Sequence, residues 1–183
     1  MGDPRTIVDL VNFQLHLIVA TNSSTVIRIC EGEYGITRRE WLFLALLAAF
    51  GALAPSQVAA HAGLDRSRTS KGLTSLHAKG LIERMQHPAD RRRASVALTA
   101  AGRDLYARLF PRVCKVNTDL LSVLSEAEVQ TLAQLALRLR ERAFEIDRAA
   151  RTGKSADRRR GGSRRVWQRE HERGAVRAGE GGY

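Results

Sequence analysis

The spacing of apolar residues along the chain predicts a mainly helical protein with one small β-hairpin. From residue 6 to about residue 31, apolar side chains return every three or four positions, as on one face of a helix, although the polar run 21–25 could bend or break it. Further helices are predicted at 37–50, 55–62, 66–79, 100–124 and 126–149. Two short runs, 81–86 and 95–98, predict the strands of a hairpin joined by a turn at 87–94.

Capping residues support several of these helix starts. Thr37 and Glu40 form a Thr-x-x-Glu capping box before the second helix, and Ser125 and Glu128 form a Ser-x-x-Glu box before the last one. Asp65 is a good N-cap for the helix 66–79. A tight turn at Gly63 joins that helix to the one before it, so the centre of the chain is predicted to be a helix-turn-helix followed by a hairpin.

The net charge of +11 is shared unequally along the chain. Residues 151–183 hold ten Lys or Arg against four Asp or Glu, so this short stretch carries more than half of the excess. It is rich in Gly and Arg and poor in apolar residues, which predicts a basic, disordered tail (150–183). Such a tail could add non-specific contacts to phosphates, or it could be an extension that contacts nothing.

Sequence signals for catalysis and metal binding are missing. Cys30 and Cys114 lie far apart, and the five histidines lack metal-ligand spacing. No Gly-rich phosphate loop or nucleophile elbow occurs. We therefore expect no catalytic residues, no metal and no cofactor, and a protein that is not an enzyme. No secretory signal or membrane-spanning run is recognisable, so a cytoplasmic protein without a membrane partner is expected.

The helix 66–79 has the pattern of a recognition helix. Thr69, Leu73 and Leu76 can face the core, and the opposite face is polar and basic. Arg and Lys can pair with guanine edges in the major groove, and Ser or Thr can reach bases or phosphates. The candidate DNA-binding residues of this helix are Arg66, Ser67, Arg68, Ser70, Lys71 and Thr74. A plain solvated helix face is the alternative interpretation.

The hairpin (81–98) carries a run of charges on its predicted turn, namely Asp90, Arg91, Arg92 and Arg93. Adjacent guanidinium groups repel one another unless an anion neutralises them, and an arginine on a hairpin tip can enter a narrow minor groove. These four residues complete the candidate DNA-binding set. The alternative is a surface turn whose arginines only improve solubility.

Residues 55–102 resemble the multiple-antibiotic-resistance regulator (MarR) family of bacterial winged-helix proteins. The residues that carry the resemblance are Gln57-Val58-Ala59, Gly63-Leu64-Asp65, Leu76 to Arg84, Asp90-Arg91-Arg92 and Val96 to Gly102. The family's wing pattern, Asp-x-Arg followed by Leu-Thr, is met by Asp90, Arg92, Leu98 and Thr99. Gly72 stands where the family usually has a larger residue, which could mark a close helix contact or a recognition helix that orders fully only on DNA.

The resemblance implies a fold, a partner and an assembly. The fold would be a winged helix-turn-helix (37–99) flanked by N-terminal (1–36) and C-terminal (100–149) dimerisation helices. The protein would be an obligate homodimer that binds a palindromic operator in double-stranded DNA, most simply as a repressor. Carried over by position, Ser67, Arg68, Ser70 and Lys71 would read the major groove, Arg92 would enter the minor groove, and Asp90 would orient the wing arginine.

The family resemblance also implies release of DNA by a small aromatic carboxylate or phenolic ligand. The effector site would lie where the dimerisation helices meet the winged helix, near His16, Arg38, Arg39, Trp41 and Phe43. An arginine beside an aromatic wall suits an aryl acid. Trp41 and Phe43 could equally be ordinary core residues.

Two other interpretations remain open at this point. Cys30 could act as a thiol-based redox sensor, because Arg28 nearby would lower its pKa. Alternatively, the winged helix could be a module that binds protein or RNA. The polar helix and the short wing, which lack exposed apolar or stacking aromatic residues, argue against that second alternative.

Overall fold

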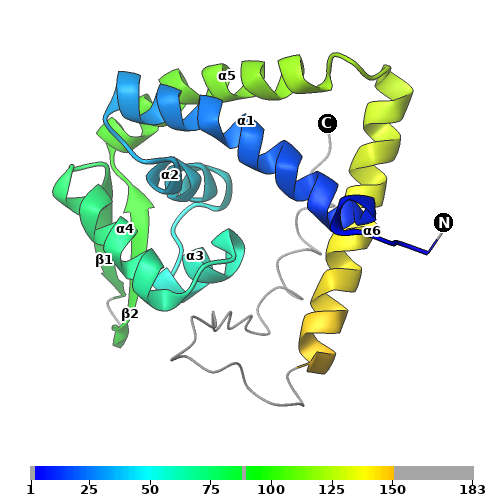
Figure 1. Cartoon of the computed structure of the whole chain (residues 1–183). Coiled ribbons are helices and arrows are strands. Elements are labelled where there is room, and N and C mark those ends of the chain that lie inside the picture. The colour runs from blue at the N-terminus through cyan, green and yellow to red at the C-terminus, as the bar shows by residue number, and fades with distance from the viewer. Residues whose placement is uncertain (1–2, 88–89, 151–183) are drawn as a thin grey trace. The chain divides into compact units, whose positions relative to one another are not determined.

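The computed structural model describes residues 3–87 and 90–150, without the side chains of residues 86, 87, 90–93 and 150. Its elements, in chain order, are η1 (Ile7–Asp9), α1 (Val11–Tyr34), α2 (Arg38–Phe50), α3 (Pro55–Ala62), α4 (Arg66–Ala78), β1 (Ile82–His87), β2 (Asp90–Leu98), α5 (Ala100–Leu121) and α6 (Glu126–Ala150) (Figure 1). The predicted fold class, mainly α with a small hairpin, is confirmed. Within the described residues, no helix is both long enough and apolar enough to cross a membrane.

Local differences from the prediction occur at the first helix and at the wing. The chain begins as a 3₁₀ turn and becomes extended at Leu10, after which α1 continues without a break through the polar run 21–25. The predicted turn 87–94 is wrong, because Asp90 already pairs with His87 and opens β2. A register shift between Gln86 and His87 accommodates the longer strand. The backbone of residues 91–93 therefore belongs to a strand.

The described chain divides into two compact units, one ending at Val113 and the other beginning at Cys114. In the first unit, Figure 1 shows α2, α3 and α4 gathered beside the β1–β2 hairpin. Leu53, between α2 and α3, exchanges two backbone hydrogen bonds with Val96 of β2, at 3.0 and 2.8 Å. The hairpin is thereby attached to the helix-turn-helix. The fully buried side chains of this unit include Phe43, Leu44, Val58, Leu76 and Leu109.

Gly72 allows α4 to pack closely on α2. A Cβ at this position would lie 2.5 Å from Cε2 of Phe43, whose side chain is completely buried. Real side chains do not approach so closely, and a ring enclosed by the core has little room to withdraw. The structure therefore supports the first of the two explanations for this glycine, a close helix contact.

Gly72→Ala is expected to destabilise the protein by about 1–3 kcal/mol through overpacking. A loss of stability would be informative, because Gly→Ala inside an exposed helix normally stabilises a protein by about 1 kcal/mol. Gly32→Ala is the matched control, because a Cβ at Gly32 in α1 would meet nothing within 4 Å. Urea unfolding of both variants measures the difference. Equal stabilisation of both would contradict the packing described for Phe43.

Candidate nucleic-acid interface

The start of α4 is fixed by local hydrogen bonds. The carboxylate of Asp65 accepts a hydrogen bond from the backbone N–H of Arg68 at 2.8 Å, as the N-cap prediction requires. The hydroxyl of Thr69 donates to the carbonyl of Asp65 at 2.9 Å. Thr69, Leu73 and Leu76 are buried, which confirms the predicted inward face. The orientation of the opposite face is thus set by the helix itself.

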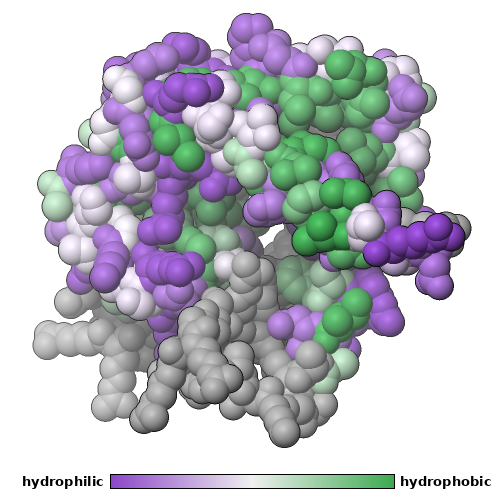
Figure 2. All heavy atoms as spheres, viewed as in Figure 1, coloured by the Kyte–Doolittle hydropathy of each residue, from purple (hydrophilic) through white to green (hydrophobic). Residues whose placement is uncertain are grey.

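The outward face of α4 is exposed and basic. Ser67, Ser70, Lys71 and Thr74 line one shallow hollow on the surface, so the helix brings these four side chains together. Arg66 and Arg68, on either side of Ser67 in the first turn, are also exposed. Arg68 also pairs with Asp65, with 3.3 Å between Nε and Oδ2, which holds its guanidinium near the first turn. Figure 2 shows a mainly hydrophilic surface over this part of the molecule.

The charged residues predicted for the wing fall at the edge of what the structure describes. The backbone of Asp90, Arg91, Arg92 and Arg93 lies in β2, but their side chains lie outside the described part. Pro88 and Ala89 also lie outside it. The predicted roles of these four residues in DNA binding stay predictions.

The C-terminal end of α4 is attached to α2 by the buried carboxylate of Glu40, which the sequence indicated only as part of a capping box. Glu40 is 2% exposed and accepts from the N–H of Thr37 at 2.7 Å and from Nζ of Lys79 at 2.9 Å. Lys79 also donates to the carbonyl of Gly35 at 2.9 Å. A single acidic residue within an apolar helix was the signal that could have indicated a partner. This network joins the turn between α1 and α2 to the C-terminal end of α4.

The pKa of Glu40 lies below its usual value of 4.5. Burial by itself would raise this pKa, but hydrogen bonds from Ser75, Lys79 and Thr37, with the charge of Lys79, outweigh it. Because the pKa is lower in the folded state, the stabilisation is complete above the unfolded pKa. It is lost as the pH falls through the folded pKa.

Glu40→Gln is expected to lower the free energy of unfolding by about 1–3 kcal/mol at neutral pH, because a charged acceptor of several hydrogen bonds is removed. The difference from the native chain should shrink as the pH falls below 4.5. Urea unfolding at a series of pH values measures it, with Glu83→Gln as the control for an exposed carboxylate. A difference that stays constant in acid would rule out an ionised Glu40 as its source.

The predicted effector residues occupy different environments. His16 on α1 is exposed, as are Arg38 and Arg39 in the first turn of α2. Trp41 is buried and stacks on Tyr106 of α5, with 5.5 Å between ring centroids, whereas Phe43 is enclosed beneath Gly72. None of the five lines the hollow on α4. Their role as a ligand site stays a prediction.

The environment of Cys30 differs from the one predicted. Its side chain is fully buried, and burial raises the pKa of the thiol to about 11. The carboxylate of Glu31 acts in the same direction and Arg38 only partly opposes both. The expectation that Arg28 would favour the thiolate is therefore wrong, because desolvation decides the shift.

Comparisons with known proteins agree with this geometry. A model of the MarR family matches residues 34–93. A candidate transcriptional regulatory protein for the hcr operon of Thauera aromatica is 35% identical over 105 residues, which are 57% of this chain and 63% of that protein. The chain thus matches less than two thirds of this relative's length.

Solved structures share the fold. A MarR/EmrR family regulator from Acinetobacter sp. ADP1 has a TM-score of 0.71 at 23% identity, covering 76% of this chain and 99% of that one. A MarR family regulator from Streptomyces coelicolor, solved in complex with DNA, has a TM-score of 0.66 at 20% identity, covering 77% and 92%. These relatives are described as regulators of transcription and not as enzymes. Residues 34–93 thus match the MarR family, and the chain shares the winged-helix fold of the solved structures.

Proposed function

We propose that the chain is a dimeric regulator that binds a palindromic operator in double-stranded DNA. The observation that carries this proposal is the exposed basic face of α4, held outward by the buried stripe of Thr69, Leu73 and Leu76. That face has the dimensions and the donors of a helix that enters the major groove. The regulator from Streptomyces coelicolor that has the same fold was solved in complex with DNA, which supports DNA as the partner.

The proposed roles follow the exposure of each residue. Ser67, Arg68, Ser70 and Lys71 read base edges, while Arg66 and Thr74 contact the backbone at the margins of the groove. In the wing, Arg92 enters the minor groove, Asp90 orients it, and Arg91 and Arg93 contact phosphates. A footprint on DNA flanking the chain's own gene tests the proposal. Two protected half-sites about one helical turn apart are expected, and protection without two-fold symmetry would oppose it.

Exposed apolar side chains support a homodimer. Along α1 these include Leu15, Ile18 and Val19, all at least 42% exposed, and Figure 2 shows hydrophobic residues at the surface there. In the second unit, α6 exposes Leu132, Leu135, Leu139 and Ile146. Helices of a monomer rarely leave so much apolar surface in water. Sedimentation should give twice the mass of the chain, and a monomer at micromolar concentration would contradict the proposed assembly.

We further propose that the chain is a repressor and that a small aromatic carboxylate or phenol releases it from operator DNA. The stacked rings of Trp41, Tyr106 and Phe110 support this ligand class, since Phe110 is 45% exposed and gives the stack an open side. Arg38 and Arg39 would pair with the carboxylate, and His16 would lie beside the ligand. Benzoate should weaken operator binding by the native chain. It should weaken operator binding by the Arg39→Gln variant to a smaller extent. Equal weakening in both would exclude Arg39 from the site.

The alternative thiol switch at Cys30 has little support, because a thiol with a pKa of about 11 is protonated at neutral pH. Cys114, which is half-buried, is expected to react with a thiol reagent before Cys30 does in the folded protein. Labelling the variants Cys30→Ser and Cys114→Ser separately measures the two rates. A Cys30 thiol that reacts as fast as Cys114 would restore the redox interpretation.

The predicted basic tail, residues 150–183, lies outside the described residues except for the backbone of Ala150. We propose that its ten Lys and Arg residues between 151 and 183 add sequence-independent phosphate contacts. Removing residues 151–183 should reduce the slope of log affinity against log salt. An unchanged slope would show that the tail does not contact DNA.

A further inference from the structure

One acidic residue lies at the start of the basic face of α4. Asp65 is the N-cap of the helix and directly precedes Arg66, Ser67 and Arg68. A cap does not require a negative charge, because Asn and Ser cap helices about as well as Asp. The helix dipole favours the charge, but the phosphates of bound DNA would repel it. The contacts of the two carboxylate oxygens therefore decide whether Asp65 is only a cap.

The two oxygens of Asp65 contact different parts of one residue. Oδ1 accepts the backbone N–H of Arg68 at 2.8 Å, and Oδ2 lies 3.3 Å from Nε in the side chain of Arg68. Exposed ion pairs are usually weak, partly because two flexible side chains must be ordered together. Here the capping bond already orders the carboxylate. Only the arginine side chain loses freedom when this pair forms.

The contact at Nε determines which edge of the Arg68 guanidinium remains available. The group is planar and rigid, and its N–H donors form a fork of fixed geometry. With Nε facing Asp65, the Nη1 and Nη2 groups remain for another partner, and the side chain is 61% exposed. Two N–H donors of an arginine match the O6 and N7 acceptors of guanine in the major groove. The pair thus presents the edge that a guanine requires.

We propose that Asp65 is a positioning residue for Arg68 and thereby sets a preference for guanine in each DNA half-site. Because the ion pair orders the arginine before binding, less rotamer freedom is lost when the base contact forms. Entry of α4 into the groove removes water around the pair and strengthens the attraction between its charges. This inference rests on the proposed function, since it requires α4 to read the major groove.

A selection from random-sequence DNA duplexes tests the inference without knowledge of the operator. The full-length chain and its Arg68→Ala variant are incubated with the library at one salt concentration, and the bound duplexes are sequenced. The native chain should favour guanine over adenine by about fivefold or more at one position of each half-site. Arg68→Ala should lose this preference, which identifies the position that Arg68 reads.

Two substitutions of Asp65 separate positioning from capping. Asp65→Asn and Asp65→Ser both retain a capping side chain and remove the ion pair. Each should reduce the guanine preference at the Arg68 position by about threefold or more and leave the other positions unchanged. Binding to an unrelated duplex should not weaken, because a charge that repels phosphates is removed. Equal weakening on all duplexes would indicate a merely structural role and would overturn the inference.

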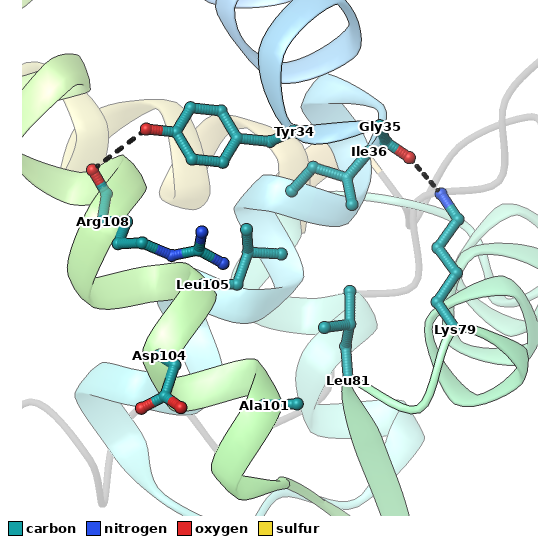
Figure 3. Close-up of a pocket in the computed structure, with 9 residues that line it drawn as sticks. All are labelled: Tyr34, Gly35, Ile36, Lys79, Leu81, Ala101, Asp104, Leu105 and Arg108. Atoms are coloured by element: carbon teal, nitrogen blue, oxygen red, sulfur yellow. Dashed lines mark hydrogen bonds between the residues drawn. The ribbon is translucent and has the colours of Figure 1, made fainter.

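Asp104→Asn is the matched control for the change in net charge. Asp104 is exposed, and Figure 3 shows its side chain on α5, apart from Lys79 at the end of α4. This variant should keep the guanine preference of the native chain. An equal loss of preference in the control would show that net charge, and not the contact with Arg68, is responsible.

A double-mutant cycle shows whether Asp65 acts through Arg68. In the Arg68→Ala background, adding Asp65→Asn should change the base preference no further. A further loss as large as in the native background would assign Asp65 another route and overturn the inference. If the native chain enriches no sequence, the proposed function fails and this inference fails with it. A native guanine preference that survives in both Asp65 variants overturns the inference alone.

Discussion

Gly102→Ala is expected to lower the free energy of unfolding by about 3 kcal/mol or more, the upper end of overpacking. A Cβ on Gly102 would overlap the backbone carbonyl oxygen of Leu81, closer than any real contact. Neither side can withdraw easily. The Leu81 carbonyl accepts the N–H of Thr99 at 3.1 Å, and the N–H of Gly102 donates to the hydroxyl of Thr99 at 3.1 Å. Relief therefore requires the start of α5 to separate from the start of the hairpin.

The free energies of unfolding of Gly102→Ala and Gly32→Ala are measured in parallel by chemical denaturation. Because a Cβ at Gly32 meets nothing within 4 Å, the difference between the two variants separates the effect of the clash from that of helix propensity. The hydroxyl of Thr99 also donates to the carbonyl of Gly80 at 2.7 Å, so the same few atoms join α4, β1 and α5. We expect Gly102→Ala to bind operator DNA more weakly as well, because the wing is displaced. If the free energy of unfolding of Gly102→Ala lies within about 0.5 kcal/mol of the native value, the contact between Gly102 and Leu81 can rearrange at little cost, contrary to this prediction.

Arg68→Ala/Lys71→Ala is expected to abolish most of the base preference of the protein. Each bidentate contact to a base is worth about 1–3 kcal/mol of discrimination, so two lost contacts reduce specificity by about 2–6 kcal/mol. Both side chains are exposed, and neither contributes to the buried stripe of α4. Folding should therefore be nearly unaffected, apart from the loss of the exposed ion pair between Arg68 and Asp65.

A matched control separates specificity from charge. Arg5→Ala/Arg28→Ala removes the same two charges from exposed positions outside α4. Affinities for operator and for unrelated DNA are measured for both double variants at one salt concentration. The α4 variant should lose the difference between the two DNAs and the control should keep it. An unchanged preference in the α4 variant would remove these residues from the proposed interface.

Much of the fold could be predicted because its signals are local. The Thr37–Glu40 and Ser125–Glu128 capping boxes are present with the hydrogen bonds expected of them. The inward face of α4 followed directly from helical periodicity. Each of these features depends on residues at most one or two turns apart.

Features that depend on distant residues could not be read from the sequence. Glu40 and Lys79 are far apart in the chain, and only the packing of α2 against α4 brings them together. The pKa of Cys30 follows from burial, which no neighbouring residue reveals. The length of β2 depends on cross-strand pairing. In the candidate interface, likewise, the exposed face of α4 was predictable, whereas the attachment of its end through Lys79 to Glu40 was not.

We propose that α4 reads a specific DNA sequence. The most direct measurement is the affinity of the full-length chain for DNA flanking its own gene, compared with a scrambled duplex of equal length and charge at the same salt. A preference of about a thousandfold or more for the flanking DNA is expected. Equal affinity for the two duplexes would instead show that the basic face of α4 attracts phosphates without reading bases.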